Sequence, residues 1–214
     1  MQSVIFDIDG TLIESTDFDS RLYRQAVTDV LGAVTIRDDW DDYRHVTDGG
    51  ILRELLEENG ISSSASAFGA VKERFIDLVE SHLGLEPCTP VRGAAELLRQ
   101  LDNSETHQIG LATGGWRRTA VAKLESAGLD FAGIPFCSSD DAEDRQEIMR
   151  RCLQNIPKPT GSVVYVGDGP WDLRASKGLG WGFIAVGDRL QKIHEPWIRD
   201  FARGELEAVL SRLH

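Results

Sequence analysis

Short apolar runs of strand length recur along the chain, and helical segments separate them. Four runs bounded by turn residues are clear: Val4–Phe6, Ile109–Ala112, Val163–Val166 and Phe183–Val186. A weaker fifth run is Ile134–Cys137. These runs lack a strict alternation of apolar and polar residues, which is typical of parallel strands covered on both faces. Strands that alternate with helices therefore predict an α/β fold with a parallel sheet flanked by helices.

The helical segments show apolar residues at three- and four-residue spacing. Gly128 and Gly178 are placed where a helix would close with a left-handed residue. The helices predicted in the second half of the chain are Gly93–Leu101, Arg117–Ser126, Arg145–Leu153, Pro170–Lys177 and Leu206–Leu213.

A helix-only block separates the first strand from the rest. It extends from about Thr16 to Leu85, and the serine patch of residues 62–66 is expected to be a loop inside it. Such a block predicts a small all-α domain inserted just after the first strand. We therefore expect a core domain of residues 1–15 and 86–214, and a helical cap of residues 16–85.

Composition narrows the class of protein. The net charge of −12 comes without any run of Lys and Arg, which argues against a nucleic-acid partner. The three cysteines form no CxxC pair, so neither a disulfide framework nor a thiolate zinc site is expected. The apolar runs are far shorter than the ~20 residues that span a membrane, and no signal-peptide pattern is present. We expect a cytoplasmic protein without a membrane partner, either a monomer or a homodimer.

Three predicted strands are followed directly by a polar residue, namely Asp7, Thr113 and Asp168. In open α/β sheets, ligands bind outside the carboxyl ends of the strands, so these side chains would meet if their strands are neighbours. Each one taken alone is better explained as a turn or N-cap residue, which Asp and Thr favour.

Taken together, these positions resemble the motifs of the haloacid dehalogenase (HAD) superfamily, in its phosphatase branch. Asp7–Leu12 reads Asp-Ile-Asp-Gly-Thr-Leu and resembles the first motif. Leu111–Gly115 resembles the second motif, and Val166–Asp172 resembles the fourth, which pairs Asp168 with a second Asp four residues later. The resemblance covers essentially the whole chain and is strongest to the phosphoglycolate phosphatase-like branch. It implies a Rossmann-like core with a C1-type helical cap.

The third motif departs from the family pattern, which usually places a lysine there. Lys158 lies only 10 residues before Asp168, so it is rejected. Arg145 lies 23 residues before Asp168 and opens a predicted helix, which makes it the candidate for this cation. Its planar, permanently charged guanidinium can serve a phosphoryl oxygen. Alternatively, Arg145 pairs only with the acidic run that precedes it.

The resemblance also implies a mechanism. Asp7 would attack phosphorus to form an aspartyl-phosphate, and Asp9 would act as general acid and then general base. Thr113, the backbone N–H of Gly114 and Arg145 would bind the phosphoryl oxygens.

Two carboxylates and a phosphate require a cation, and Mg²⁺ is expected. By resemblance it would be held by Asp7, the backbone carbonyl of Asp9 and Asp168. Asp172 would be a second ligand or an outer support, or simply an acid near a helix N-terminus.

The cap would contact the rest of a small phosphorylated metabolite. The specificity candidates precede a predicted helix and are Arg44, His45, Thr47, Asp48 and Gly49. Thr47 or Asp48 could instead be an ordinary N-cap. Phosphoglycolate, sugar phosphates and nucleoside monophosphates all remain open as substrates. A phosphomutase of the β-phosphoglucomutase kind and a non-catalytic phosphate- or metal-binding descendant remain as alternatives to a phosphatase.

Overall fold

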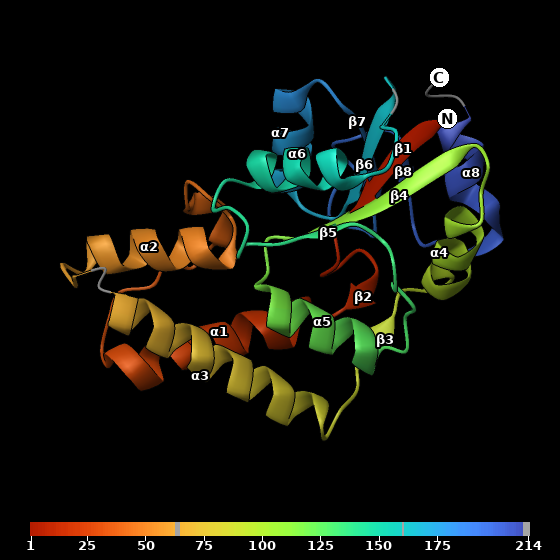
Figure 1. The fold of residues 1–214 in the computed structure, drawn as a ribbon. Helices are drawn as coiled ribbons and strands as arrows, with labels where there is room; N and C mark the ends of the chain where they lie inside the picture. The colour runs from red at the N-terminus through yellow and green to blue at the C-terminus, as the bar shows by residue number, and fades with distance from the viewer. Residues whose placement is uncertain (63–64, 160, 212–214) are drawn as a thin grey trace.

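A computed structural model describes residues 1–62, 65–159 and 161–211. Its main sheet has six strands in the order β5-β4-β1-β6-β7-β8, and every neighbouring pair is parallel (Figure 1). The strands are β1 (Gln2–Phe6), β4 (His107–Ala112), β5 (Phe136–Cys137), β6 (Val163–Gly167), β7 (Gly182–Val186) and β8 (Trp197–Ile198). The predicted α/β class with a parallel sheet is confirmed.

Helices cover both faces of this sheet, because its strands are apolar on both sides. The helices that cover the sheet are α4 (Ala94–Asp102), α5 (Arg117–Ser126), α6 (Arg145–Asn155), α7 (Pro170–Leu179) and α8 (Glu205–Leu210). Val4 and Phe6 of β1 face an apolar cluster with α4, α5 and α8, whereas Ile5 faces α6 and α7.

Two helix ends differ from the prediction. Gly178 does not close α7; it lies inside the helix, where the side chain of Gln146 on α6 packs against it, and a Cβ would be 2.8 Å from that side chain. Gly180, with φ 69°, closes α7 instead, whereas Gly128 is left-handed as predicted. The sequence predicts that the last helix extends to Leu213, but residues 212–213 lie outside the described residues.

Helices α1 (Thr16–Leu31), α2 (Asp48–Glu58) and α3 (Ala65–Leu83) form a helical insertion after β1, consistent with a C1 cap. The short antiparallel strands β2 (Ile13–Glu14) and β3 (Thr89–Pro90) pair at its base. They were not predicted, and the exact domain boundaries stay a prediction. In the serine patch, residues 63–64 lie outside the described residues and Ser66 is already in α3. Two 3₁₀ turns complete the fold, Trp40–Asp42 and Ala202–Gly204.

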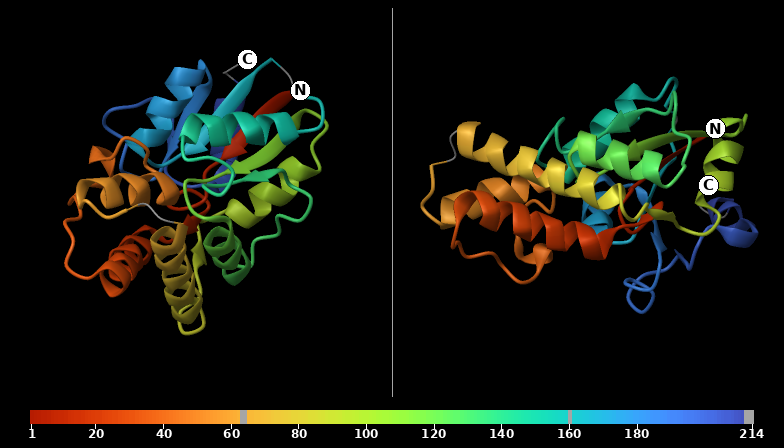
Figure 2. Two further views of the ribbon diagram at one scale, coloured as in Figure 1. Left: turned by 60° about the vertical axis from the view of Figure 1, so that its left-hand side comes forward. Right: turned by 90° about the horizontal axis from the view of Figure 1, so that it is seen from below.

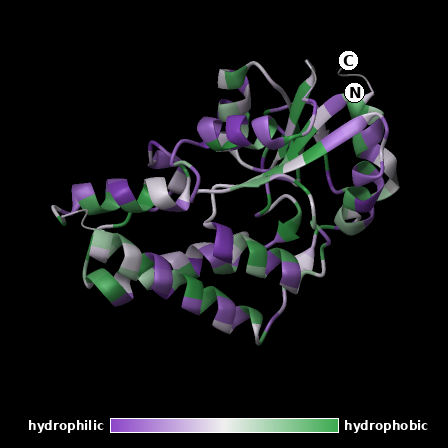
Figure 3. Cartoon of the chain, in the orientation of Figure 1, coloured by the Kyte–Doolittle hydropathy of each residue, from purple (hydrophilic) through white to green (hydrophobic). Residues whose placement is uncertain are grey.

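Helix α5 connects the cap to the sheet. It packs against α3, which packs against α1, so that the three helices lie side by side (Figure 2). Trp116, just before α5, is buried against Tyr23 of α1 and Phe75 of α3, with ring centroids 5.8 Å apart in both pairs. Each cap helix carries both hydrophobic and hydrophilic residues (Figure 3). Within the described chain, no helix is both long and apolar enough to cross a membrane.

Candidate active site

Three adjacent strands end at one place. Asp7 follows β1, Thr113 follows β4 and Asp168 follows β6, and β1 lies between the other two. Because parallel strands present their carboxyl ends at the same edge, the three side chains converge there. The sequence-predicted convergence is therefore present in the structure.

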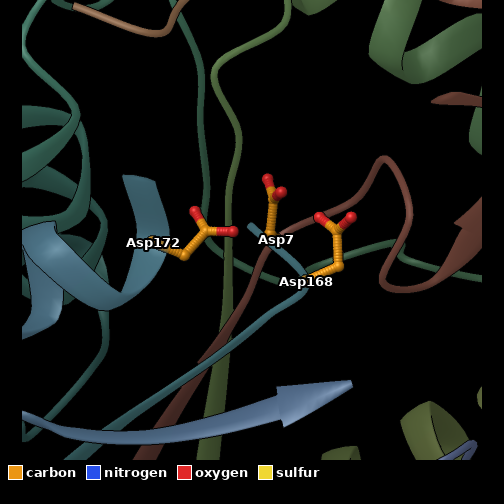
Figure 4. A group of neighbouring side chains, drawn as sticks. All are labelled: Asp7, Asp168 and Asp172. Atoms are coloured by element: carbon orange, nitrogen blue, oxygen red, sulfur yellow. The ribbon is translucent and has the colours of Figure 1, made fainter. Parts of the chain in front are cut away.

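Three carboxyl groups cluster at this edge (Figure 4). Asp7, Asp168 and Asp172 are buried, and one ligand atom from each lies within 4.8 Å of the others. Burial raises the pKa of Asp7 to about 8 and that of Asp168 to about 7. One oxygen of each of these two, Oδ1, is buried without a hydrogen-bond partner among the described residues. Unsatisfied buried carboxyl oxygens at this spacing fit a hard divalent cation.

Asp172 differs from the other two carboxyls because both of its oxygens have donors. Its Oδ1 accepts from Nη1 of Arg145 at 2.8 Å, and its Oδ2 accepts from the N–H of Gly169 at 3.0 Å. It occupies the first turn of α7, as predicted. An acid whose oxygens are already bonded in this way suits a supporting role better than direct coordination.

The loop after β1 approaches the cluster closely at Gly10. This residue has φ 75°, and a Cβ here would lie 2.5 Å from Oδ2 of Asp168. Only glycine combines this backbone conformation with that approach. The glycine of the first motif is thus required by the geometry around Asp168.

Arg145 begins α6 and is directed into the same cluster. Its Nη1 lies 3.5 Å from Oδ1 of Asp7 as well as 2.8 Å from Asp172. Burial disfavours the charged guanidinium, but its attraction to the two carboxylates is the larger effect. The pKa of Arg145 is therefore raised above its ordinary value. The preceding Asp144 instead caps α6 by accepting from the N–H of Gln146 at 2.7 Å. In contrast, Lys158 is exposed.

Thr113 and Gly114 lie beside the Arg145 guanidinium. Thr113 is buried, and its Oγ1 accepts from the N–H of Gly115 at 3.1 Å. A Cβ on Gly114 would collide with Nη2 of Arg145, so a glycine is needed for the guanidinium to lie against this loop. The carbonyl of Gly114 accepts from the N–H of Asp48 at 2.8 Å, which joins this loop to the cap.

Sequence reasoning missed Lys123. This α5 lysine is completely buried, and its Nζ lies 2.5 Å from Oδ1 of Asp9 and 2.8 Å from Oδ1 of Asp19 on α1. Ser15 also donates to Oδ1 of Asp9. A signal was present, because Lys123 shares the buried face of α5 with Ala120 and Leu124. A lysine on the apolar face of a helix needs a partner in the interior.

The sequence model for haloacid dehalogenase-like hydrolases matches residues 1–180 of this chain. The protein belongs to this family. Its relatives include a phosphoglycolate phosphatase from Synechococcus elongatus, 28% identical over 200 residues that cover 87% of this chain and 84% of the relative.

Solved structures share the fold of this chain. A hydrolase from Pseudomonas syringae superposes with a TM-score of 0.77 at 22% identity, covering 100% of both chains. CbbY from Rhodobacter sphaeroides, solved in complex with phosphate, gives a TM-score of 0.71 at 20% identity and covers 96% of each chain.

The HAD-type cap contributes some of its predicted residues to a cavity above Asp7. Thr47 and Asp48 line this cavity, whereas Arg44 and His45 line a separate hollow beside α6 and α7. Thr47 is also the N-cap of α2, accepting from the N–H of Gly50 at 3.2 Å, so that alternative is realised. Gly49 packs on the core, donating its N–H to Oγ of Ser139 at 2.9 Å. The cavity is also lined by cap residues that were not predicted, among them Asp19, Ser20, Tyr23 and Trp40.

Proposed function

We propose that this HAD-family hydrolase is a phosphatase that cleaves a small phosphomonoester, with Asp7 as the nucleophile. The observation that carries the proposal is the environment of the Asp7 carboxyl group. It is 3% exposed, one of its oxygens has no hydrogen-bond partner among the described residues, and a guanidinium lies 3.5 Å away. A desolvated carboxyl with a free oxygen beside a fixed cation is suited to accept a phosphoryl group.

The donor set around Asp7 also fits Mg²⁺. Oδ1 of Asp7 and Oδ1 of Asp168, which accept no hydrogen bond from the described residues, would hold the ion, and the backbone carbonyl of Asp9 would be the third ligand from the protein. Asp172 would support the site through Arg145 and Gly169. When bound, the ion would offset the negative charge of the phosphoryl group.

The chain's own residues divide the remaining tasks. Asp7 forms a bond to phosphorus as the bond to the leaving oxygen breaks, and Asp9 gives that oxygen a proton. Asp9 then takes a proton from the water that cleaves the aspartyl-phosphate and releases phosphate. Oδ1 of Asp9 already accepts hydrogen bonds from Lys123 and Ser15. The proton would therefore be carried by Oδ2, which faces Gly115.

The phosphoryl oxygens would be bound by Thr113, the N–H of Gly114 and Arg145. These groups lie at one edge of the sheet with Asp7, and Arg145 is held in place by Asp172 and by the carbonyl of Val46 at 2.9 Å. A fixed guanidinium requires little reorganisation when charge develops on the phosphoryl oxygens.

The test is phosphate release from a panel of small phosphomonoesters, with Mg²⁺ and with a chelator. We expect metal-dependent release in the wild type and none with Asp7→Asn, which keeps the size of the side chain. Asp130→Asn is a matched control at an exposed position outside the helices and strands, and it should leave release unchanged. Release that survives in Asp7→Asn would overturn the nucleophile assignment. Net transfer to a sugar rather than to water would replace the phosphatase with a phosphomutase.

A further inference from the structure

The cavity above Asp7 is small, and residues of the cap line one side of it. Its volume is about 100 Å³, well below the roughly 300–1,000 Å³ of pockets for drug-sized ligands. A larger hollow of about 560 Å³ is lined by Gly10, Ser15 and Asp168 and shares Thr16 with this cavity. With a phosphoryl group on Asp7, a cavity of this volume has room for only a few further non-hydrogen atoms.

The cap wall of this cavity is acidic. Asp19 of α1 and Asp48 of α2 face it, alongside the hydroxyl-bearing Ser20 and Tyr23. Among the described lining residues, the only basic one is Arg145, whose guanidinium is engaged with carboxylates at the other end. A leaving group that extends from the phosphoryl site therefore meets carboxyls rather than cations.

Each of these two carboxyls has one oxygen held in place and one without a hydrogen bond to the described residues. Oδ2 of Asp48 accepts from the N–H of Trp116 at 2.8 Å, and Oδ1 of Asp19 accepts from Lys123 at 2.8 Å. Tyr23 donates to the carbonyl of Asp48 at 2.6 Å, which fixes the start of α2 against α1. The acidic wall is thus positioned before any ligand arrives.

The carboxyl groups at the cap wall outnumber the basic groups that pair with them among the described residues. Asp9 and Asp19 share the single ammonium of Lys123, and Asp48 has no basic partner within ion-pair distance among the described residues. Burial, together with the nearby Asp19, raises the pKa of Asp48 well above its ordinary range. Another negative group placed here would meet repulsion in a poorly solvated space, whereas a positive group would relieve it.

We infer that the substrate is a small phosphomonoester whose leaving group carries a protonated amine, bound by Asp19 and Asp48. This inference rests on the proposed phosphatase function. Oδ1 of buried Asp7, which has no hydrogen-bond partner among the described residues, marks the phosphoryl end of the same cavity. The inference excludes leaving groups that end in a carboxylate or a second phosphate. Phosphoglycolate and sugar bisphosphates are therefore poor substrates of this chain.

Three esters test the charge of the leaving group. Their leaving groups each have two carbon atoms and differ in the terminal group: 2-aminoethyl phosphate, 2-hydroxyethyl phosphate and phosphoglycolate. We expect kcat/KM to fall in that order, with the amine preferred over the carboxylate by on the order of ten- to hundredfold, the range of a hydrogen bond to a charged group. Equal values for the three esters, or the reverse order, would overturn the inference.

Variants locate the effect. In Asp48→Asn and Asp19→Asn, the ratio of kcat/KM for the amine to that for the hydroxyl should fall towards one. A ratio is unaffected by the fraction of protein that is active, so partial misfolding does not obscure it. Asp17→Asn makes the same change on the exposed side of α1, outside the cavity, and should keep the wild-type ratio. A wild-type ratio in both cavity variants would refute the assignment of these two residues.

Failure of the phosphatase function can be told apart from failure of this inference. Phosphate release from 4-nitrophenyl phosphate or 2-hydroxyethyl phosphate establishes the phosphatase, whatever the order of the three esters. If no ester is hydrolysed, calorimetric titration of the wild type with the same three compounds still ranks their binding. Preferred binding of the amine would support the inference, and equal, reversed or absent binding would overturn it.

Discussion

Lys123→Met should destabilise the protein more than any substitution of an exposed lysine. The ammonium is completely buried between Asp9 and Asp19, and methionine keeps the length of the side chain without its charge. Removing one partner of a buried ion pair costs about 3–5 kcal/mol, because the remaining charge is left in the interior. This is a large part of the roughly 5–15 kcal/mol that stabilises a typical domain.

Urea unfolding followed by circular dichroism measures this loss. At an m value of about 3 kcal/mol per M, the midpoint should fall by about 1 M or more. Lys177→Met is the control, because Lys177 is an exposed lysine in helix α7, and it should change stability by less than about 0.5 kcal/mol. Adding Asp19→Asn to Lys123→Met removes one of the two carboxylates that are left without a cation. The double variant should therefore lose less unfolding free energy than the sum of the losses in the two single variants.

The loss should also depend on pH. Burial raises the pKa of Asp19 to about 6 even though Lys123 opposes the rise. Without Lys123, a carboxyl takes up a proton more readily in the folded than in the unfolded state. The variant therefore loses stability as the pH rises through the folded pKa. The difference in urea midpoint between the wild type and Lys123→Met should be larger at pH 8 than at pH 5. Equal midpoints for Lys123→Met and Lys177→Met would refute the buried ion pair.

Three further outcomes are expected. Arg145→Ala should lower phosphate release by about 10²–10³-fold and Arg145→Lys by much less; equal rates in wild type and Arg145→Ala would exclude a role for the guanidinium. Burial raises the pKa values of Asp7 and Asp168 to about 8 and 7, so the metal-free protein should lose stability as the pH rises through this window. Mg²⁺ competes with those protons, and its thermal shift should be larger at pH 8.5 than at pH 6. Gly10→Ala should abolish the Mg²⁺ shift because its Cβ would displace Asp168, whereas Gly60→Ala, with φ 63° and open space around it, should only lower the melting temperature.

The sheet and the convergence of the site were predictable because both depend on local pattern. Short apolar runs mark parallel strands, and polar residues at the ends of adjacent strands must meet. The burial of Lys123 was not predictable in the same way. It depends on Asp9 and Asp19, more than one hundred residues away in the chain, and Asp19 resembles an ordinary acid near a helix N-terminus.

Other departures also have tertiary causes. Gly178 has the residue type of a helix end, but it is needed where α6 and α7 approach each other. Strand β8 has only two residues, too few to show a periodic pattern, and it exists because it pairs with β7. Arg44 and His45 precede α2 as expected, yet the chain directs them to a different hollow from the one that Asp48 lines.

Helix α5 limits how freely caps could be exchanged between relatives. It starts directly after the loop of residues 113–116, packs on α3 and contributes Lys123 to Asp19 of α1. A chimaera that replaces only the inserted helices would leave the α5 ammonium facing a foreign surface and would break the aromatic stack around Trp116. The unit that can be grafted is therefore the inserted helices together with a matching α5, although α5 belongs to the other half of the sequence.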